Sequence, residues 1–243
     1  MIGYLFFARR LKEREFMQSS LTKAKHWVFD LDNTLYPPGS NLFHQVDMRM
    51  REFIAAQFNI ELGEAFKLQK QYFHEYGTTL SGLMQHHDMP PEPFLDYVHD
   101  IDVSVIDPNP TLDRVLAKLP GKKMIYTNGS FAHAERVTSR LGISHHFDDV
   151  FDIVAADYRP KPDESAYHSL LSRYEIDPVR TVMVEDVARN LEPAKRLGMA
   201  TVLIHTEHRW SEDSDGVDYV DHRIDDLTDW LSALVEEETD SAA

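Results

Sequence analysis

The chain has 243 residues, 42% of them hydrophobic, and carries a formal net charge of −16 at pH 7. This length and composition are typical of one large globular domain, or of one domain with a smaller insertion. The acidic excess argues against a nucleic-acid polymer as a partner, because such a partner is bound through clustered Lys and Arg side chains. The chain has no cysteine, which excludes disulfides and thiolate chemistry.

The N-terminal residues contain neither a membrane span nor an export signal. Residues 2–8 are apolar, but they are too few to cross a bilayer, and basic residues follow them within positions 9–12. A signal peptide has the opposite order, with its basic residues first. We therefore expect a cytoplasmic protein with no membrane partner. We also expect residues 1–22 to be an N-terminal extension, in which the first 16 residues have no catalytic role and Met17 offers an alternative start of translation.

From Lys25 onward, short apolar segments alternate with amphipathic ones. The apolar segments are rich in Val, Ile, Phe and Tyr and have the length of buried strands, whereas the others show helical spacing. This alternation predicts an α/β fold with a doubly wound parallel sheet. The expected strands are residues 26–31, 123–127, 150–155, 181–185 and 201–205, and the expected helices are residues 111–119, 131–141, 163–174 and 187–197.

Residues 41–105 interrupt the alternation, because they contain no convincing strand. Phe43, Val46 and Met50 recur at helical spacing, and a second helical pattern ends near Gly77. We expect a small helical cap domain inserted into the α/β core, with residues 23–40 and 106–243 forming that core. The acidic residues between 212 and 240 are expected to form a solvated face or tail.

The strongest motif is Phe-Asp-Leu-Asp-Asn-Thr at residues 29–34, at the end of the first predicted strand. Side chains two residues apart lie on the same face of a strand, so Asp30 and Asp32 would point to one place if the extended geometry persists. Ligands of open α/β sheets bind just outside the carboxyl ends of the strands. Two adjacent acids repel each other, so stability alone does not explain them.

Three further polar motifs lie beside predicted strand ends or helix starts. Thr127 and Asn128 precede a helix, whose N-terminus can bind an anion. Lys161 lies between two prolines and can counter the charge of a phosphate. Glu185 and Asp186 form a second acid pair, and carboxylate oxygens are hard ligands that suit Mg²⁺. Each motif alone is equally typical of a turn, a surface lysine or a helix cap, but together they predict a site for phosphate and Mg²⁺.

The order Asp-x-Asp-x-Thr, Thr-Asn, Lys and Glu-Asp resembles the haloacid dehalogenase superfamily, and the helical insertion resembles its members with a small helical cap. Four further strings, at residues 32–36, 76–80, 97–102 and 188–191, look like the pyrimidine 5'-nucleotidase branch, which dephosphorylates nucleoside monophosphates. Val187 departs from the pattern, since many relatives carry a small hydroxyl residue there. The resemblance implies a hydrolase that takes a small phosphomonoester.

The resemblance also implies a mechanism and a set of site residues. Asp30 would attack phosphorus and form an aspartyl-phosphate, while Asp32 would protonate the leaving oxygen and then activate water. Nearby acids would raise the pKa of Asp32 and cations would lower it, so the direction of the shift stays open. The implied ligands of Mg²⁺ are Asp30, Asp186, Asp32 through its backbone carbonyl, and Glu185 directly or through water, and the implied phosphate-binding residues are Thr127, Asn128 and Lys161.

The cap is expected to determine which substrate is bound. The candidates to stack on or hydrogen-bond a base are Tyr36, Tyr76, Thr78, Leu80 and His99. The adjacent histidine pairs at 86–87 and 145–146 show no evident chelating geometry, so we expect no zinc site.

Four other functions use similar residues. A dehalogenase needs no proton donor such as Asp32, which argues against that activity. A phosphomutase needs the same acids and differs mainly in excluding water. A phosphatase for another small molecule, such as phosphoglycolate, is the main alternative. A phospho-acceptor switch also uses an Asp, acidic metal ligands, a Thr and a Lys, but Asp32 and the inserted cap argue against it.

Overall fold

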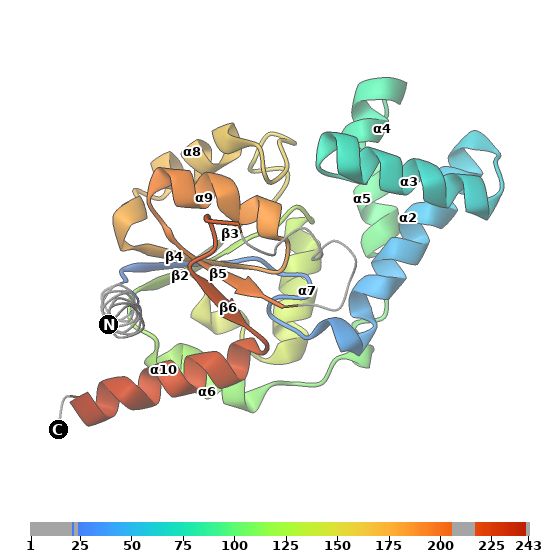
Figure 1. The fold of residues 1–243 in the computed structure, drawn as a ribbon. Helices are drawn as coiled ribbons and strands as arrows, with labels where there is room; N and C mark the ends of the chain where they lie inside the picture. The colour runs from blue at the N-terminus through green and yellow to red at the C-terminus, as the bar shows by residue number, and fades with distance from the viewer. Residues whose placement is uncertain (1–20, 22–23, 206–216, 242–243) are drawn as a thin grey trace, which may run out of the picture.

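A six-stranded parallel sheet forms the centre of the structure, a computed structural model that describes residues 21, 24–205 and 217–241 (Figure 1). The strand order β3-β2-β1-β4-β5-β6 extends in both directions from β1, so the predicted doubly wound parallel sheet is confirmed. The strands are β1 His26–Phe29, β2 Lys122–Tyr126, β3 Asp149–Phe151, β4 Thr181–Glu185, β5 Ala200–Ile204 and β6 His222–Ile224.

Helices cover both faces of the sheet, because successive residues of each strand point to opposite faces (Figure 1). Trp27 and Phe29 pack in one hydrophobic cluster with Leu116, whereas Val28 packs in a second cluster with Tyr167. The first face carries α6 Pro110–Lys118, α7 Phe131–Leu141 and α10 Leu227–Ser241, and the second carries α8 Glu164–Arg173 and α9 Leu191–Leu197.

The sequence analysis missed the last strand and helix. Strand β6 has only three residues, so it offers too short a pattern to recognise. Asp225, Asp226 and Asp229 are exposed, as expected for a solvated acidic face. The helix was not predicted, and its buried stripe consists of Leu227, Leu231 and Leu234 of α10. The predicted N-terminal extension, apart from Leu21, and the first acidic residues after 212 lie outside the described part of the chain.

Two other predicted elements were partly wrong. The strand expected at 150–155 ends at Phe151, because the Asp152 carboxylate accepts hydrogen bonds from the backbone N–H groups of Phe131 and Ala155 and so begins a turn. The helix expected at 187–197 is divided into a 3-10 turn, Ala188–Asn190, and α9.

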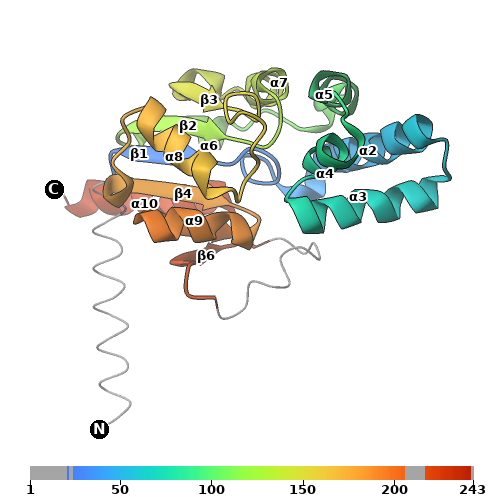
Figure 2. The same cartoon turned by 90° about the horizontal axis from the view of Figure 1, so that it is seen from above.

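Four helices form the insertion between β1 and β2, which confirms the predicted helical cap region. They lie beside the core, next to the segment that leaves β1 (Figure 2). That residues 41–105 make up a separate domain stays a prediction. In the described residues, no helix combines the length and the apolar character needed to cross a bilayer. The cap helices are α2 Leu42–Phe58, α3 Leu62–Tyr76, α4 Thr79–His87 and α5 Pro91–His99.

Two arginines of the core hold the ends of cap helices. Arg189 donates to the carbonyl oxygens of Phe73 and Gly77, at 3.1 and 3.2 Å, where α3 ends and its last carbonyls lack helical partners. The same guanidinium lies 4.3 Å from the centre of the Phe73 ring. Arg136 donates to the carbonyl oxygen of His99 at 2.7 Å, at the end of α5. The cap is therefore fixed to the core next to the strand ends.

The packing of α3 against α4 depends on Gly82. A Cβ atom at this position would lie 2.2 Å from Cγ of Tyr72. We expect Gly82→Ala to lower the free energy of unfolding by about 1–3 kcal/mol, the usual cost of overpacking, as measured by urea denaturation. Gly63→Ala is the matched control, since nothing lies within 4 Å of its Cβ position and both glycines are helical. Equal effects of the two substitutions would contradict this packing.

Candidate active site

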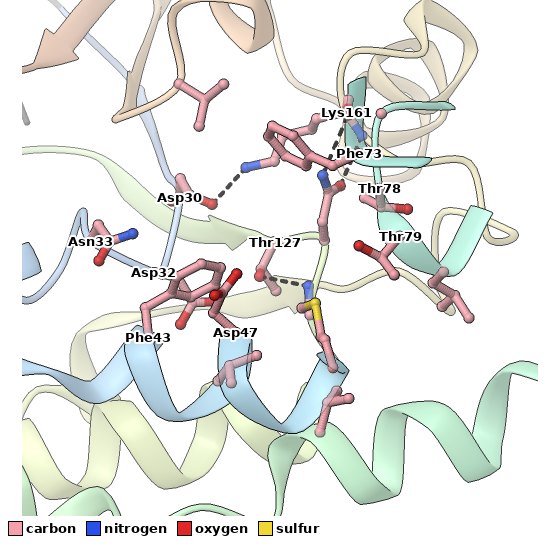
Figure 3. Close-up of a pocket in the computed structure, with 18 of the residues that line it drawn as sticks. Asp30, Asp32, Asn33, Phe43, Asp47, Phe73, Thr78, Thr79, Thr127 and Lys161 are labelled. Atoms are coloured by element: carbon pink, nitrogen blue, oxygen red, sulfur yellow. Dashed lines mark hydrogen bonds and ion pairs between the residues drawn. The ribbon is translucent and has the colours of Figure 1, made fainter. Parts of the chain in front are cut away.

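The four sequence motifs meet in one cavity of about 150 Å³ between the core and the cap (Figure 3). Asp30 follows β1, Thr127 follows β2 and Asp186 follows β4, and Lys161 comes from the loop before α8. Because these strands are parallel and adjacent, their carboxyl ends bring residues distant in sequence to one edge of the sheet.

Lys161 is 1% exposed and its ammonium group lies at the centre of the site. Its Nζ lies 2.6 Å from Oδ1 of Asp30 (Figure 3) and 2.7 Å from Oε2 of Glu185, and donates to the carbonyl oxygen of Tyr126 at 2.9 Å. Burial alone would lower the pKa of Lys161, but the two carboxylates raise it instead. Lys161 is therefore a buried, charged residue rather than a surface lysine.

Three buried carboxyl groups lie close to this ammonium group. The carboxylate oxygens of Asp30, Glu185 and Asp186 lie within 4.8 Å of one another. Burial and the charge of Glu185 raise the pKa of Asp30 to about 7, against the opposing effect of Lys161. The same two causes raise the pKa of Asp186. Three acids facing one lysine leave an excess of negative charge, so this cluster fits a divalent cation with oxygen ligands such as Mg²⁺.

Asn128 and Thr127 shape the loops beside Asp30. The side-chain amide of Asn128 accepts from the backbone N–H of Lys161 at 2.8 Å and donates to its carbonyl oxygen at 3.3 Å. The hydroxyl of Thr127 accepts from the N–H of Gly129 at 2.9 Å. These bonds fix the positions of Lys161 and of the start of α7 relative to Asp30. Contacts of Thr127 and Asn128 with a phosphoryl group stay a prediction, as does the carbonyl of Asp32 as a metal ligand.

Asp32 lies in the same cavity as Asp30 but has other partners. Its Oδ1 accepts from the hydroxyl of Tyr36 at 2.6 Å and lies 2.8 Å from Nε2 of His133. Burial would raise the pKa of Asp32, but His133 and the hydrogen bond from Tyr36 outweigh burial and lower it. The sequence analysis left this direction open and missed His133, which is 101 residues away. His133 lies in the first turn of the helix that follows the Thr127-Asn128 motif, and this position could have identified it as a candidate site residue.

The five candidate specificity residues fall into two groups. Thr78, Leu80 and His99 line the cavity. Tyr36 and Tyr76 are not among the described residues that line it. The Tyr36 ring is buried in the core with its hydroxyl on Asp32, and the Tyr76 hydroxyl lies 2.7 Å from Nε2 of His86 within the cap. The cap side of the cavity also contains aromatic and aliphatic side chains, namely Phe43, Val46, Met50, Phe73, Phe94, Leu95 and Val98.

A second group of possible metal ligands lies away from the cavity. Oδ1 of Asp113 is 2.7 Å from Nε2 of His146 and 3.2 Å from Nε2 of His145. The sequence analysis considered this histidine pair without Asp113, which comes from a different helix. All three ligand atoms lie within 4.8 Å of one another. Asp113 therefore lies close enough to the two histidines to bind a metal with them, which the sequence spacing does not show.

The excess of negative charge in the acid cluster predicts that replacing Asp186 by a neutral residue stabilises the metal-free protein. A carboxyl group with a raised pKa in the folded state contributes stability at low pH and loses it as the pH rises through that value. We expect Asp186→Asn to raise the Tm of the metal-free protein at pH 8 by about 2–4 °C, the change that about 1 kcal/mol produces in a chain of this size. The same substitution should abolish the Tm increase caused by Mg²⁺.

The control for this measurement is Asp107→Asn, because the Asp107 side chain is 98% exposed. It should change neither the Tm nor the effect of Mg²⁺. A lower Tm of metal-free Asp186→Asn at pH 8, or an unchanged response to Mg²⁺, would contradict the description of this cluster.

Known proteins resemble this chain in sequence and in fold. The chain is 27% identical to Phosphate metabolism protein 8 of Saccharomyces cerevisiae, over 82% of this chain and 67% of that protein. It is 29% identical to Glyceraldehyde 3-phosphate phosphatase of Methanocaldococcus jannaschii, over 85% of this chain and 96% of that protein. A HAD phosphatase structure from Thermococcus onnurineus shares the fold, with a TM-score of 0.57, 19% identity and coverage of 86% and 97%. Residues 24–198 match the haloacid dehalogenase-like hydrolase model, and the chain belongs to that family.

Proposed function

We propose that the protein is a Mg²⁺-dependent phosphomonoesterase that transfers the phosphoryl group of a small molecule first to Asp30 and then to water. The observation that carries this proposal is the contact of buried Lys161 with both Asp30 and Glu185 at the end of the cavity. A fixed cation beside a carboxylate nucleophile suits a dianionic phosphoryl group. Two relatives whose names refer to phosphate chemistry support the same reaction.

In the first half of the reaction, a carboxylate oxygen of Asp30 attacks phosphorus and the bond from phosphorus to the leaving oxygen breaks. Asp32 gives a proton to that oxygen, so the product leaves as an alcohol. Lys161 is placed to balance the negative charge of the phosphoryl oxygens, and Thr127 and Asn128 to bind them. Asp30, Glu185 and Asp186 would hold Mg²⁺, and its positive charge would favour ionised Asp30 and offset the charge of the phosphoryl group.

In the second half, Asp32 takes a proton from water and the resulting hydroxide attacks phosphorus. The bond between phosphorus and the Asp30 oxygen breaks, which releases inorganic phosphate and restores both acids. The lowered pKa of Asp32 favours the ionised form that this step requires, and it opposes the protonated form that the first half requires.

The preferred substrate class in this proposal is the nucleoside monophosphates, with pyrimidines first. The motif strings that resemble the pyrimidine 5'-nucleotidase branch support this choice. So does the lining of the cavity, because Phe43, Phe73 and Phe94 offer aromatic surface on which a base can pack. Thr78 and His99 add polar groups to that surface.

A second substrate class is a phosphoester with only a few carbon atoms, such as a triose phosphate or phosphoglycolate. The cavity volume of about 150 Å³ favours it, since a cavity of about this volume holds a ligand the size of benzene. The likeness to a relative named as a glyceraldehyde 3-phosphate phosphatase also favours it.

The central test is the release of inorganic phosphate by the wild type and by Asp30→Asn in the presence of Mg²⁺. We expect many turnovers by the wild type and a loss of at least about 10³-fold for Asp30→Asn, because a neutral amide cannot act as the nucleophile. Asp157→Asn, at a side chain that is 84% exposed, should keep wild-type activity. Wild-type activity of Asp30→Asn would exclude Asp30 as the nucleophile. A single stoichiometric labelling without turnover would indicate a phospho-acceptor switch instead.

The substrate class is determined by measuring kcat/KM for a panel of pyrimidine and purine monophosphates, glyceraldehyde 3-phosphate and phosphoglycolate. We expect the highest kcat/KM for a pyrimidine monophosphate, since the cap provides aromatic surface for the base. A strong preference for either small phosphoester over every nucleotide would contradict the nucleotidase assignment and leave the phosphatase mechanism in place.

A further inference from the structure

Two side chains contact the same oxygen of the Asp32 carboxylate. The Tyr36 hydroxyl donates to Oδ1 at 2.6 Å, and Nε2 of His133 lies 2.8 Å from the same atom. An ionised carboxylate only accepts hydrogen bonds, so the proton of a neutral His133 lies on Nε2. Asp32 lines the cavity and His133 is not among its described lining residues. Both donors therefore approach Asp32 from the protein interior.

His133 is itself held in place. Its ring stacks on His99 with centroids 4.4 Å apart and planes 10° from parallel. Nδ1 of His99 lies 2.9 Å from the hydroxyl of Ser130, and this hydroxyl also accepts from the backbone N–H of His133. Ser130 thus caps α7 and orients the ring on which His133 packs. The imidazole has little freedom to turn away from Asp32.

The burial of His133 has no evident benefit for stability. Its side chain is 0% exposed, and its Nδ1 has no hydrogen-bond partner among the described residues. Burying an unpaired polar atom is unfavourable, so an apolar residue of similar size would suit the core better. The interaction that distinguishes histidine from such a residue here is the bond to Asp32.

We propose that His133 is a positioning residue for Asp32. Together with Tyr36 it holds Oδ1, so that Oδ2 alone exchanges protons with the leaving oxygen and with water. This inference rests on the proposed phosphatase mechanism, in which Asp32 protonates the leaving oxygen. It concerns the orientation of the carboxylate, and it assigns no direct contact between His133 and the substrate.

The test compares two leaving groups with the full chain and Mg²⁺. p-Nitrophenolate departs without a proton, whereas the alkoxide of uridine 5'-monophosphate or of glyceraldehyde 3-phosphate needs one. The preferred alkyl substrate of the panel is used for the comparison. The parameter kcat/KM is measured because it reports the steps up to departure of the leaving group.

We expect His133→Phe, which keeps a ring against His99, to lower kcat/KM for the alkyl phosphate by about 100-fold, the lower range for a general acid. The loss for p-nitrophenyl phosphate should stay within about fivefold, because this step needs no proton donor. His133→Gln should regain at least about tenfold, since its amide N–H can occupy the place of the Nε2–H group. Like His133→Phe, Tyr36→Phe should lower kcat/KM more for the alkyl phosphate than for p-nitrophenyl phosphate.

Equal losses for the two substrates in a folded His133→Phe protein would overturn the proposal, as would unchanged activity or a Gln variant no better than Phe. If His133→Phe does not fold, His133→Asn replaces it under the same criteria, because its shorter amide does not reach Oδ1. Failure of the proposed function gives a different result. In that case the wild type releases no phosphate from any substrate, and the inference about His133 falls with it.

Discussion

The buried ammonium group of Lys161 is the interaction on which the rest of the site depends. Moving an ammonium and two carboxylates out of water costs several kcal/mol per ion, and their attraction offsets this only with good geometry. Nζ of Lys161 meets Asp30, Glu185 and a backbone carbonyl within 2.9 Å. These contacts fix the distance between two strand ends. These contacts do not include Asp186, and its burial beside Glu185 is the electrostatic reason to expect a divalent ion.

The sheet makes this arrangement possible. Strand β1 lies between β2 and β4, so the residues that follow these three strands converge at one edge. Asp30 remains part of the sheet, because its backbone N–H donates to the carbonyl of Val184 at 2.9 Å. The helical cap then covers this edge, held by Arg189 and Arg136 of the core. The core thus places three carboxyl groups and Lys161 on one side of the cavity, and apolar side chains of the cap line the other side.

Sequence patterns were sufficient for five of the six strands of the sheet and for the residues next to their ends. Buried strands have a strong apolar signal, and Asp30, Thr127 and Glu185 are located by the strands that they follow or end. The three-residue strand β6 and the buried stripe of α10 were missed, since one was too short and the other lay among acidic residues. The hydrogen-bond partners of Asp32 could not be predicted from sequence patterns either. Its partner His133 is distant in sequence, and Tyr36 was assigned to the substrate although its ring is buried beside Asp32.

The most direct measurement for the central claim is the position of the phosphoryl group during turnover. The enzyme is mixed with Mg²⁺ and radiolabelled substrate, quenched in acid and digested, and the labelled peptide is sequenced by mass spectrometry. The proposed mechanism predicts one phosphoryl group on Asp30, and none in the Asp30→Asn protein. Label on another residue would contradict it, as would turnover without covalent label under conditions in which hydrolysis of the acyl phosphate is the slow step.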